Sequence, residues 1–146
     1  MSESLQLRTA GSGDLEAIRS LLAAEGLPIE GVAESIEHFL VIDNGDGVVA
    51  SAGIELHGNC ALLRSVVVVP ELRGRGLAGR LVERLVEHAR ALGSRAMYLL
   101  TIDADGYFVA HEFERIARER APQEILDCQE FRHLCPDSAI LMQRKI

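Results

Sequence analysis

Residues 66–93 read VVVVPELRGRGLAGRLVERLVEHARALG, and this stretch decides the fold. The four valines predict a buried strand, and a glycine-rich loop with two arginines follows it. After the loop, apolar residues recur every three or four positions from Leu77 to Leu92, which is typical of an amphipathic helix. Gly93 stands where a glycine commonly ends a helix. The stretch therefore predicts a strand, a loop and a helix in that order.

The glycines of this loop fit the fingerprint of a dinucleotide-binding site. Gly74, Gly76 and Gly79 spell G-x-G-x-x-G, and Asp103 lies about where a ribose-binding acid is expected. A dinucleotide site, however, needs its strand to run almost directly into the first glycine, and PELR intervenes here. A P-loop is disfavoured as well, because no Lys-Ser or Lys-Thr pair follows the last glycine.

The same loop also spells R-x-x-G-x-A with Arg73, Gly76 and Ala78. A loop that enters a helix in this way presents successive backbone N–H groups at the positive end of the helix dipole. Glycine lets an anion approach the backbone closely, and arginines add charge that pairs with phosphate oxygens. The loop therefore predicts a pyrophosphate site, with a plain glycine-rich loop and solvated arginines as the alternative.

The sequence on either side completes a mixed sheet. Residues 5–10 predict a first strand, and Asp14 is expected to cap the helix that follows it. Turn signals at NGDG (44–47) and HGN (57–59) join three strands into an antiparallel meander that ends at the four valines. Residues 95–102 predict a buried strand after the central helix, which makes one βαβ crossover. A short helix, two further strands and an irregular helical stretch complete a single domain over residues 1–146.

Composition narrows the classes of function. The chain of 146 residues carries 15 basic and 22 acidic side chains and no Trp, and no basic cluster lies outside the loop, so we expect no nucleic-acid partner. No apolar run is long enough to span a bilayer, and no secretory signal is evident, so no membrane partner is expected. Three cysteines without close spacing, Cys60, Cys128 and Cys135, predict a reducing, cytoplasmic location and no metal site.

Residues 66–93 resemble the acetyl-coenzyme A-binding motif of the GCN5-related N-acetyltransferases, and the order of elements around them resembles that superfamily too. The resemblance implies an α+β fold with a mixed six- or seven-stranded sheet, an antiparallel meander plus one βαβ crossover, flanked by helices. The segments GLP (26–28), LLRSV (62–66), YLLT (98–101) and LCPDSAILM (134–142) further resemble small bacterial acetyltransferases associated with arsenic resistance.

This resemblance implies direct acetyl transfer from acetyl-coenzyme A to the amine of a small molecule, for which an amino-acid-like compound is a candidate. It leaves a homodimer open. It also implies that backbone N–H groups at a bulge around Val67, Val68 and Val69 polarise the thioester carbonyl. The loop residues that would hold the cofactor are Arg73, Gly74, Arg75, Gly76, Leu77 and Ala78.

The chain departs from the superfamily where a tyrosine usually protonates the departing thiolate. The superfamily's motif there is often F-Y-x-x-x-G-F. In this chain Phe108 stands at the position of its tyrosine, and Glu112 stands at the position of its glycine. Tyr107 lies one place earlier, about 100° around a helix. We take Tyr107 as the candidate acid and Phe108 as a cofactor contact. A non-catalytic acyl-coenzyme A-binding or regulatory module is the alternative that this departure suggests.

Three further side chains are candidates for the site. Glu55, among apolar neighbours, is a candidate base for the ammonium proton, or else a solvated glutamate at a sheet edge. Arg64 is a candidate for binding a substrate carboxylate, or else a structural ion-pair partner, with Glu55 as one candidate. Thr101 ends its strand, where its hydroxyl either contacts the pantetheine arm or caps a turn.

Overall fold

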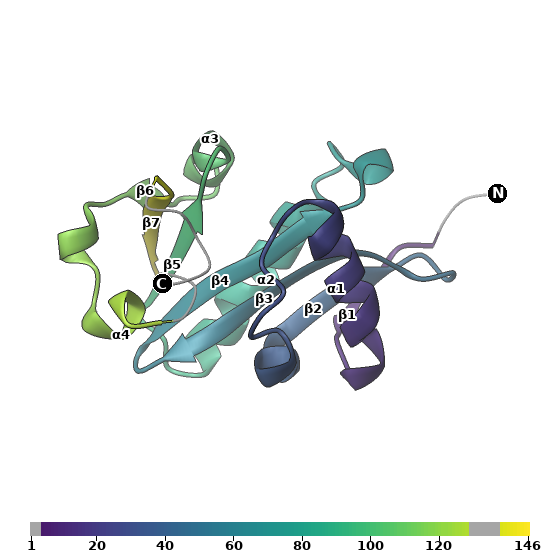
Figure 1. Cartoon of the computed structure of the whole chain (residues 1–146), viewed down its shortest axis with the longest axis horizontal. Coiled ribbons are helices and arrows are strands. Elements are labelled where there is room, and N and C mark those ends of the chain that lie inside the picture. The colour runs from purple at the N-terminus through teal and green to yellow at the C-terminus, as the bar shows by residue number, and fades with distance from the viewer. Residues whose placement is uncertain (1–3, 129–137) are drawn as a thin grey trace. The chain divides into compact units, whose positions relative to one another are not determined.

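The computed structural model describes residues 4–128 and 138–146, and its strands form one seven-stranded sheet in the order β1-β2-β3-β4-β5-β7-β6 (Figure 1). The strands are β1 (Gln6–Thr9), β2 (Phe39–Asp43), β3 (Val48–His57), β4 (Cys60–Val68), β5 (Ala96–Thr101), β6 (Glu114–Arg115) and β7 (Ile140–Lys145). The α-helices are α1 (Leu15–Ala24), α2 (Leu77–Ala91), α3 (Asp105–Val109) and α4 (Gln123–Leu126). Short 3-10 helices cover Ser12–Asp14, Ala33–His38, Pro70–Leu72 and Arg118–Arg120. The mixed α+β fold is the one predicted from the sequence.

The first turn of the meander forms as predicted. Strands β1 and β2 pair antiparallel, and so do β2 and β3. In the turn between β2 and β3, the side-chain Oδ1 of Asn44 accepts hydrogen bonds from the N–H groups of Asp46 and Gly47 at 2.9 and 3.0 Å. An asparagine side chain that bonds the backbone two residues on is a common turn device. The sequence signal at residues 44–47 therefore predicted this turn through its chemistry.

The crossover through α2 is also confirmed. Strands β4 and β5 run parallel, with Cys60 opposite Ala96 and Leu62 opposite Tyr98. The paired register ends there, although both strands continue.

Contacts divide the chain into two compact units. The first unit comprises residues 1–54 and 65–85, and the second comprises residues 55–64 and 86–146. Strands β3 and β4 and helix α2 each begin in one unit and end in the other. The extent of a single domain over residues 1–146 stays a prediction.

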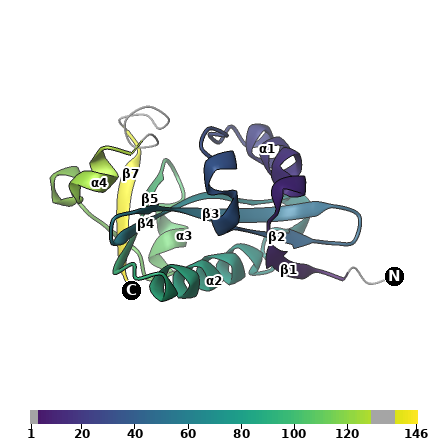
Figure 2. The same cartoon turned by 90° about the horizontal axis from the view of Figure 1, so that it is seen from below.

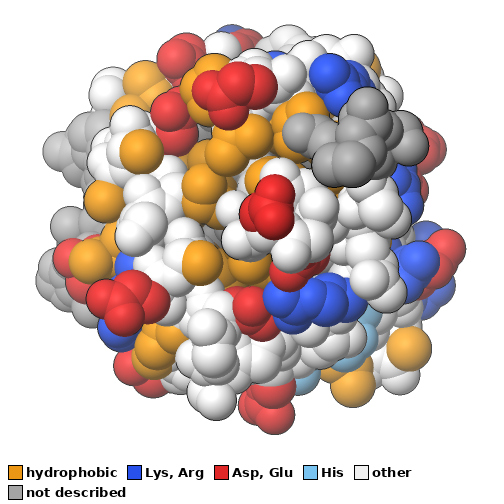
Figure 3. Space-filling view, turned by 90° about the vertical axis from the view of Figure 1, so that its right-hand side faces the viewer, with side chains coloured by type: hydrophobic (Ala, Val, Ile, Leu, Met, Phe, Trp, Pro, Cys, Tyr) orange, Lys and Arg blue, Asp and Glu red, His pale blue; other side chains and the backbone are white. Residues whose placement is uncertain are grey.

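The first unit packs its helices on a strongly apolar sheet. Helix α1 and the beginning of α2 lie on opposite faces of that part of the sheet (Figure 2). Ile18 and Leu22 of α1 are fully buried together with Phe39 and Val41 of β2. Gly53 of β3 lies opposite Phe39, whose ring occupies the space that a Cβ atom on Gly53 would need. On the face shown in Figure 3, apolar side chains near the middle lie among acidic side chains.

The second unit has its own apolar cluster. Buried residues of β4, β5, β7 and the α4 region pack together there, namely Cys60, Leu62, Ala96, Tyr98, Ala121, Ile125, Cys128 and Leu141. Cys60 and Cys128 are both buried in this cluster. Cys135 lies outside the described residues.

Two local predictions need correction. Asp14 stands at the start of α1, but its side chain makes no capping bond to that helix. Its carboxylate instead accepts hydrogen bonds from Arg8 and from the N–H of Gly11. The strand expected over residues 113–119 comprises only Glu114–Arg115. The N–H of Phe113 before it bonds to the Phe108 carbonyl, and the Ala117 carbonyl after it accepts from Arg120 as a 3-10 helix begins.

Candidate functional site

The glycine-rich loop in the first unit has the backbone that an anion site requires. Gly74 and Gly76 have φ angles of +82° and +77°, a left-handed conformation that favours glycine. No atom lies within 4 Å of the position that a Cβ would take on either residue, so the backbone is open on that side. Leu77 is buried and starts α2, while residues 73–76 are exposed. The first N–H groups of a helix lack intrahelical partners, so those of Leu77 and Ala78 are available to an anion.

Arg73 is bound to the protein itself. Its Nε donates to the carbonyl of Val68 at 3.0 Å, and its Nη2 lies 2.7 Å from the Glu25 carboxylate. The bond to Val68 joins the loop to the end of β4. The Glu25 pair is half-exposed, and such pairs contribute about 0–1 kcal/mol. Arg73 therefore shapes the loop, and any phosphate would compete with Glu25 for it.

A backbone irregularity in β4 lies just before the Val67–Val69 segment. Ser65 has a left-handed φ of +60°. The Oγ of Ser51, a fully buried residue on β3, donates to the Ser65 carbonyl at 3.0 Å. The N–H of Val69 donates to the Val49 carbonyl at 2.9 Å, so it is occupied. Sequence reasoning missed both serines, although two small polar residues within apolar strands were a visible signal.

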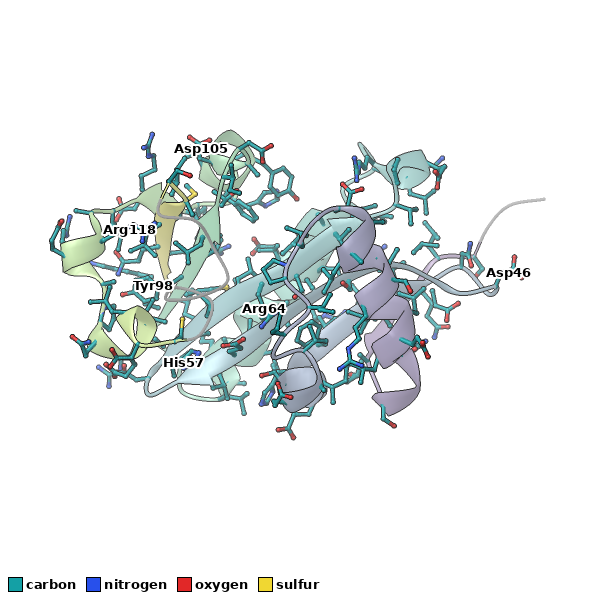
Figure 4. The ribbon with its side chains drawn as sticks, viewed as in Figure 1. Asp46, His57, Arg64, Tyr98, Asp105 and Arg118 are labelled. Atoms are coloured by element: carbon teal, nitrogen blue, oxygen red, sulfur yellow. The ribbon has the colours of Figure 1, made fainter. Side chains whose placement is uncertain are left out.

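Glu55, Arg64 and His57 form one connected group in the second unit. Glu55 Oε2 lies 2.6 Å from Arg64 Nη1, and Glu55 Oε1 lies 2.9 Å from His57 Nε2. The Arg64 side chain is 1% exposed and that of Glu55 is 14% exposed. Figure 4 labels Arg64 and His57, which lie on the neighbouring strands β4 and β3. The ion pair that was one alternative for Arg64 is thus present, whereas His57 was not foreseen as its third member.

The environment of Glu55 keeps its carboxylate charged. Burial raises the pKa of Glu55, but the hydrogen bonds from His57 and Arg64 lower that pKa by more, so that the net direction is downward. A carboxylate with a lowered pKa is a weak base. Glu55 had been a candidate for the ammonium group of an acceptor, and Arg64 for its carboxylate. The structure instead pairs them with each other.

Helix α3 ends in a motif that fixes two aromatic rings. Phe113 donates its N–H to the Phe108 carbonyl at 3.0 Å, and Glu112 donates its N–H to the Val109 carbonyl at 3.1 Å. With Glu112 at φ +70°, these bonds form a Schellman motif. The rings of Phe108 and Phe113 meet edge to face at 5.8 Å. Such a contact commonly accompanies this motif.

The motif buries Phe108 and leaves Tyr107 accessible. Phe108 is 8% exposed, so the expectation that it contacts the cofactor finds no support in its placement. Tyr107 is 40% exposed, and its ring lies 4.7 Å from that of His111. Burial raises the pKa of the Tyr107 phenol above its ordinary value. Tyr107 is therefore an accessible phenol on α3.

Thr101 acts as a cap at the end of β5. Its Oγ1 accepts a hydrogen bond from the N–H of Ala104 at 3.0 Å, just before α3. The capping alternative for this residue is confirmed by that bond. Its hydroxyl proton can still be donated to a ligand.

No group of three or more potential metal ligands occurs within residues 4–128 and 138–146. In that same part of the chain, no helix is long and apolar enough to cross a membrane.

Comparison with known proteins identifies relatives over most of the chain. The model of the acetyltransferase (GNAT) family matches residues 15–116. An uncharacterized N-acetyltransferase of Chlorobaculum tepidum is 28% identical over 83% of this chain and 81% of its own length. An amino-acid acetyltransferase of Pseudomonas aeruginosa is 29% identical over 80% of this chain, which spans only 29% of that relative. Neither name refers to arsenic, and the narrower resemblance stays a prediction.

Solved structures show the same fold at lower identity. The N-acetylglutamate synthase of Neisseria gonorrhoeae, complexed with coenzyme A and N-acetyl-glutamate, superposes with a TM-score of 0.83 at 18% identity. It covers 99% of this chain, which spans 36% of that structure. A Mycobacterium tuberculosis protein in complex with coenzyme A superposes with a TM-score of 0.81 at 22% identity, over 97% of this chain and 99% of its own.

Proposed function

The chain belongs to the acetyltransferase (GNAT) family, and from this premise we propose that it acetylates the amine of a small amino-acid-like molecule. An acetyltransferase is an enzyme, and acetyl-coenzyme A is its co-substrate. The family therefore favours catalysis over the non-catalytic module that the missing tyrosine suggested. The amino-acid-like acceptor draws support from relatives named amino-acid acetyltransferases. The chain matches those relatives over only a part of their length. Acetyl transfer is therefore the premise taken from the family, and the identity of the acceptor is what we propose.

The loop is the observation that carries this proposal. Two left-handed glycines with open space beside them precede the 15-residue helix α2. The residues assigned to the pyrophosphate are Arg73, Gly74, Arg75, Gly76, Leu77 and Ala78. Backbone N–H groups supply the main contacts, because they are directed outward and the glycines leave room for phosphate oxygens. Thr101 is assigned to the pantetheine arm through its remaining hydroxyl proton.

The reaction itself needs few side chains. The amine nitrogen forms a new amide bond to the acetyl carbon while the carbon–sulfur bond of the thioester breaks. The nitrogen gives up one proton and the sulfur takes one. Backbone N–H groups of β4 in the Val67–Val68 segment are assigned to polarise the acetyl carbonyl. Tyr107 gives its phenolic proton to the sulfur, because an accessible phenol is protonated at neutral pH and can act as a general acid.

Arg64 and Glu55 are assigned to the acceptor. Arg64 attracts the carboxylate of the acceptor through the positive charge of its guanidinium. Glu55 attracts the ammonium group and takes its proton weakly, because its pKa is lowered. Both tasks require the acceptor to reach a guanidinium that is 1% exposed. This requirement favours a small acceptor over a protein or peptide side chain.

The proposal is tested by following the release of coenzyme A with acetyl-coenzyme A and a panel of amines. The panel holds free amino acids, their amides, their methyl esters and matching amines without a carboxylate. We expect turnover with the free amino acids and a higher apparent KM for the esters. Arg64→Met should remove that preference and leave the affinity for acetyl-coenzyme A unchanged.

A thermal unfolding series provides the matched binding measurement. A ligand that binds only the native state raises the unfolding temperature. No rise at saturating acetyl-coenzyme A would contradict the assigned loop. Equal turnover of amines with and without a carboxylate would contradict the amino-acid-like acceptor and leave the acetyl transfer standing.

A further inference from the structure

We infer that Arg144 of β7 is a positioning residue that holds the α3 turn and thereby keeps Tyr107 in place for proton transfer to the thiolate. This inference rests on the proposed function of Tyr107. All the residues involved belong to the second unit. Arg144 lies opposite Met97 in the antiparallel pairing of β7 with β5, so its backbone is part of the sheet.

The Arg144 side chain contacts the turn at two points. Its Nη1 donates to the carbonyl of His111 at 3.2 Å, and its Nη2 lies 3.2 Å from the Glu112 carboxylate. Its own side chain is only 10% exposed, whereas that of Glu112 is largely exposed. An exposed carboxylate contributes little through its ion pair. The bond to the His111 carbonyl is therefore the stronger tie between the sheet and the turn.

The turn needs stabilisation from outside α3, because a residue with a Cβ adopts a left-handed conformation in it. Glu112 adopts φ +70°, which costs a residue with a Cβ about 1–2 kcal/mol. Helix α3 spans five residues, too few to be stable through its own hydrogen bonds. Packing of Phe108 on Phe113 holds the inner side of the helix. Arg144 holds the residues that follow it.

Tyr107 depends on this turn for its position. The centroid of the Tyr107 ring lies 5.2 Å from that of the Phe108 ring and 4.7 Å from that of the His111 ring. The carbonyl of Phe108 accepts a hydrogen bond from the N–H of Phe113 in the turn, and the carbonyl of His111 accepts one from Arg144. A loosened turn would move His111 away and expose the phenol to water. Other charges at this turn are those of Asp105 and Arg115, which lie 4.0 Å apart.

The tyrosine content of the chain gives a direct readout. The sequence has two tyrosines and no tryptophan, so Tyr98→Phe leaves Tyr107 as the one tyrosine. Absorbance of the phenolate during an alkaline titration then reports the pKa of Tyr107 alone. We expect Arg144→Met in this background to lower that pKa toward its ordinary value, because the phenol loses burial. Loss of a nearby positive charge would by itself raise the pKa, so a fall identifies the positional effect.

Activity provides the second readout. Arg144→Met should reduce kcat about 10- to 100-fold, with an unchanged affinity for acetyl-coenzyme A and an effect no larger than that of Tyr107→Phe. Arg144→Lys, which keeps the charge and one donor, should recover part of both values and serves if the methionine variant fails to fold. Arg118→Met is the matched control, because Arg118 also donates to a carbonyl, that of Ala139 at 2.8 Å, away from this turn.

Each outcome decides the inference. A lowered Tyr107 pKa together with a lowered kcat supports it. An unchanged pKa, or a lowered pKa with unchanged kcat, overturns it. If Tyr107→Phe retains full kcat, the proposed acid is wrong and the inference falls with it, while acceptor turnover still tests the rest of the proposed function.

Discussion

Arg64 and Glu55 face each other across neighbouring strands with 2.6 Å between Nη1 and Oε2, and a second oxygen of Glu55 binds His57. The two partners differ in burial, because the guanidinium is almost completely enclosed and the carboxylate is less so. A charge that is enclosed without its partner is far more costly than one that water can reach. The pair is therefore asymmetric: Arg64 depends on Glu55 more than Glu55 depends on Arg64.

The asymmetry predicts unequal effects of single substitutions. Glu55→Ala should lower the free energy of unfolding by about 3–5 kcal/mol, because it removes the carboxylate that lies 2.6 Å from the buried guanidinium of Arg64. Arg64→Met should cost less, since Glu55 keeps the hydrogen bond to His57. The double variant should recover part of the loss caused by Glu55→Ala. Urea unfolding of the four proteins measures this cycle. Equal costs for the two single variants would contradict it.

Gly76 is predicted to be essential for binding acetyl-coenzyme A. Gly76→Asp places a side chain at φ +77° and a negative charge beside the expected pyrophosphate, so we expect the affinity to fall more than 100-fold. Gly76→Ala tests the backbone alone and should cost about 1–2 kcal/mol of stability. Gly13→Asp is the control, because Gly13 is exposed and needs no positive φ. Calorimetric binding by a folded Gly76→Asp protein at the parent affinity would place the cofactor elsewhere.

Glu25 is predicted to compete with phosphate for Arg73. Glu25→Gln removes the competing charge 2.7 Å from Nη2 and should tighten the binding of acetyl-coenzyme A by at most about fivefold, as expected for a half-exposed pair. Arg73→Ala should weaken binding about 10- to 100-fold, because the loop loses a charge and its tie to Val68. Weaker binding by Glu25→Gln would show that Glu25 positions Arg73 and does not compete for it.

Periodicity and turn chemistry predicted the order of the elements, because these signals are local. The helix over residues 77–91 follows from apolar spacing, and the turn at Asn44 follows from its side chain. The left-handed φ of Ser65 was not predictable in this way, since a buried hydroxyl of Ser51 from another strand fixes it. Asp14 was predicted to cap α1, but the guanidinium of Arg8 binds its carboxylate.

One part of the group of Glu55, His57 and Arg64 was predictable from the sequence, namely that Glu55 and His57 are neighbours. Residues two apart on a strand point to the same face, so Glu55 and His57 had to be neighbours if residues 48–57 were extended. The burial of Arg64 was beyond such an argument, because it depends on packing between distant segments. For the same reason the sequence did not show that Phe108 is enclosed by Phe113.

Asp14 predicts a loss of stability in acid. The hydrogen bonds from Arg8, despite opposing burial, lower the pKa of Asp14 to about 2. A carboxyl group whose pKa is lower in the folded state stabilises the fold above its unfolded pKa. That contribution is lost as the pH falls toward 2. The unfolding temperature should therefore fall more steeply between pH 5 and pH 2 in the parent than in Asp14→Asn. Parallel curves would contradict this role of Asp14.

Glu112→Gly is predicted to stabilise the protein although it removes an ion pair. Glycine adopts the φ of +70° without the penalty of about 1–2 kcal/mol that a Cβ brings. The lost contact with Arg144 involves an exposed carboxylate and contributes about 0–1 kcal/mol. Glycine also loses more entropy on folding, which reduces the gain. We expect a net increase of up to about 1 kcal/mol in the free energy of unfolding. Glu112→Ala is the matched control, because it removes the same carboxylate and keeps the Cβ, so it should be neutral or destabilising. If both variants lose the same stability, the carboxylate matters more than the backbone at this turn.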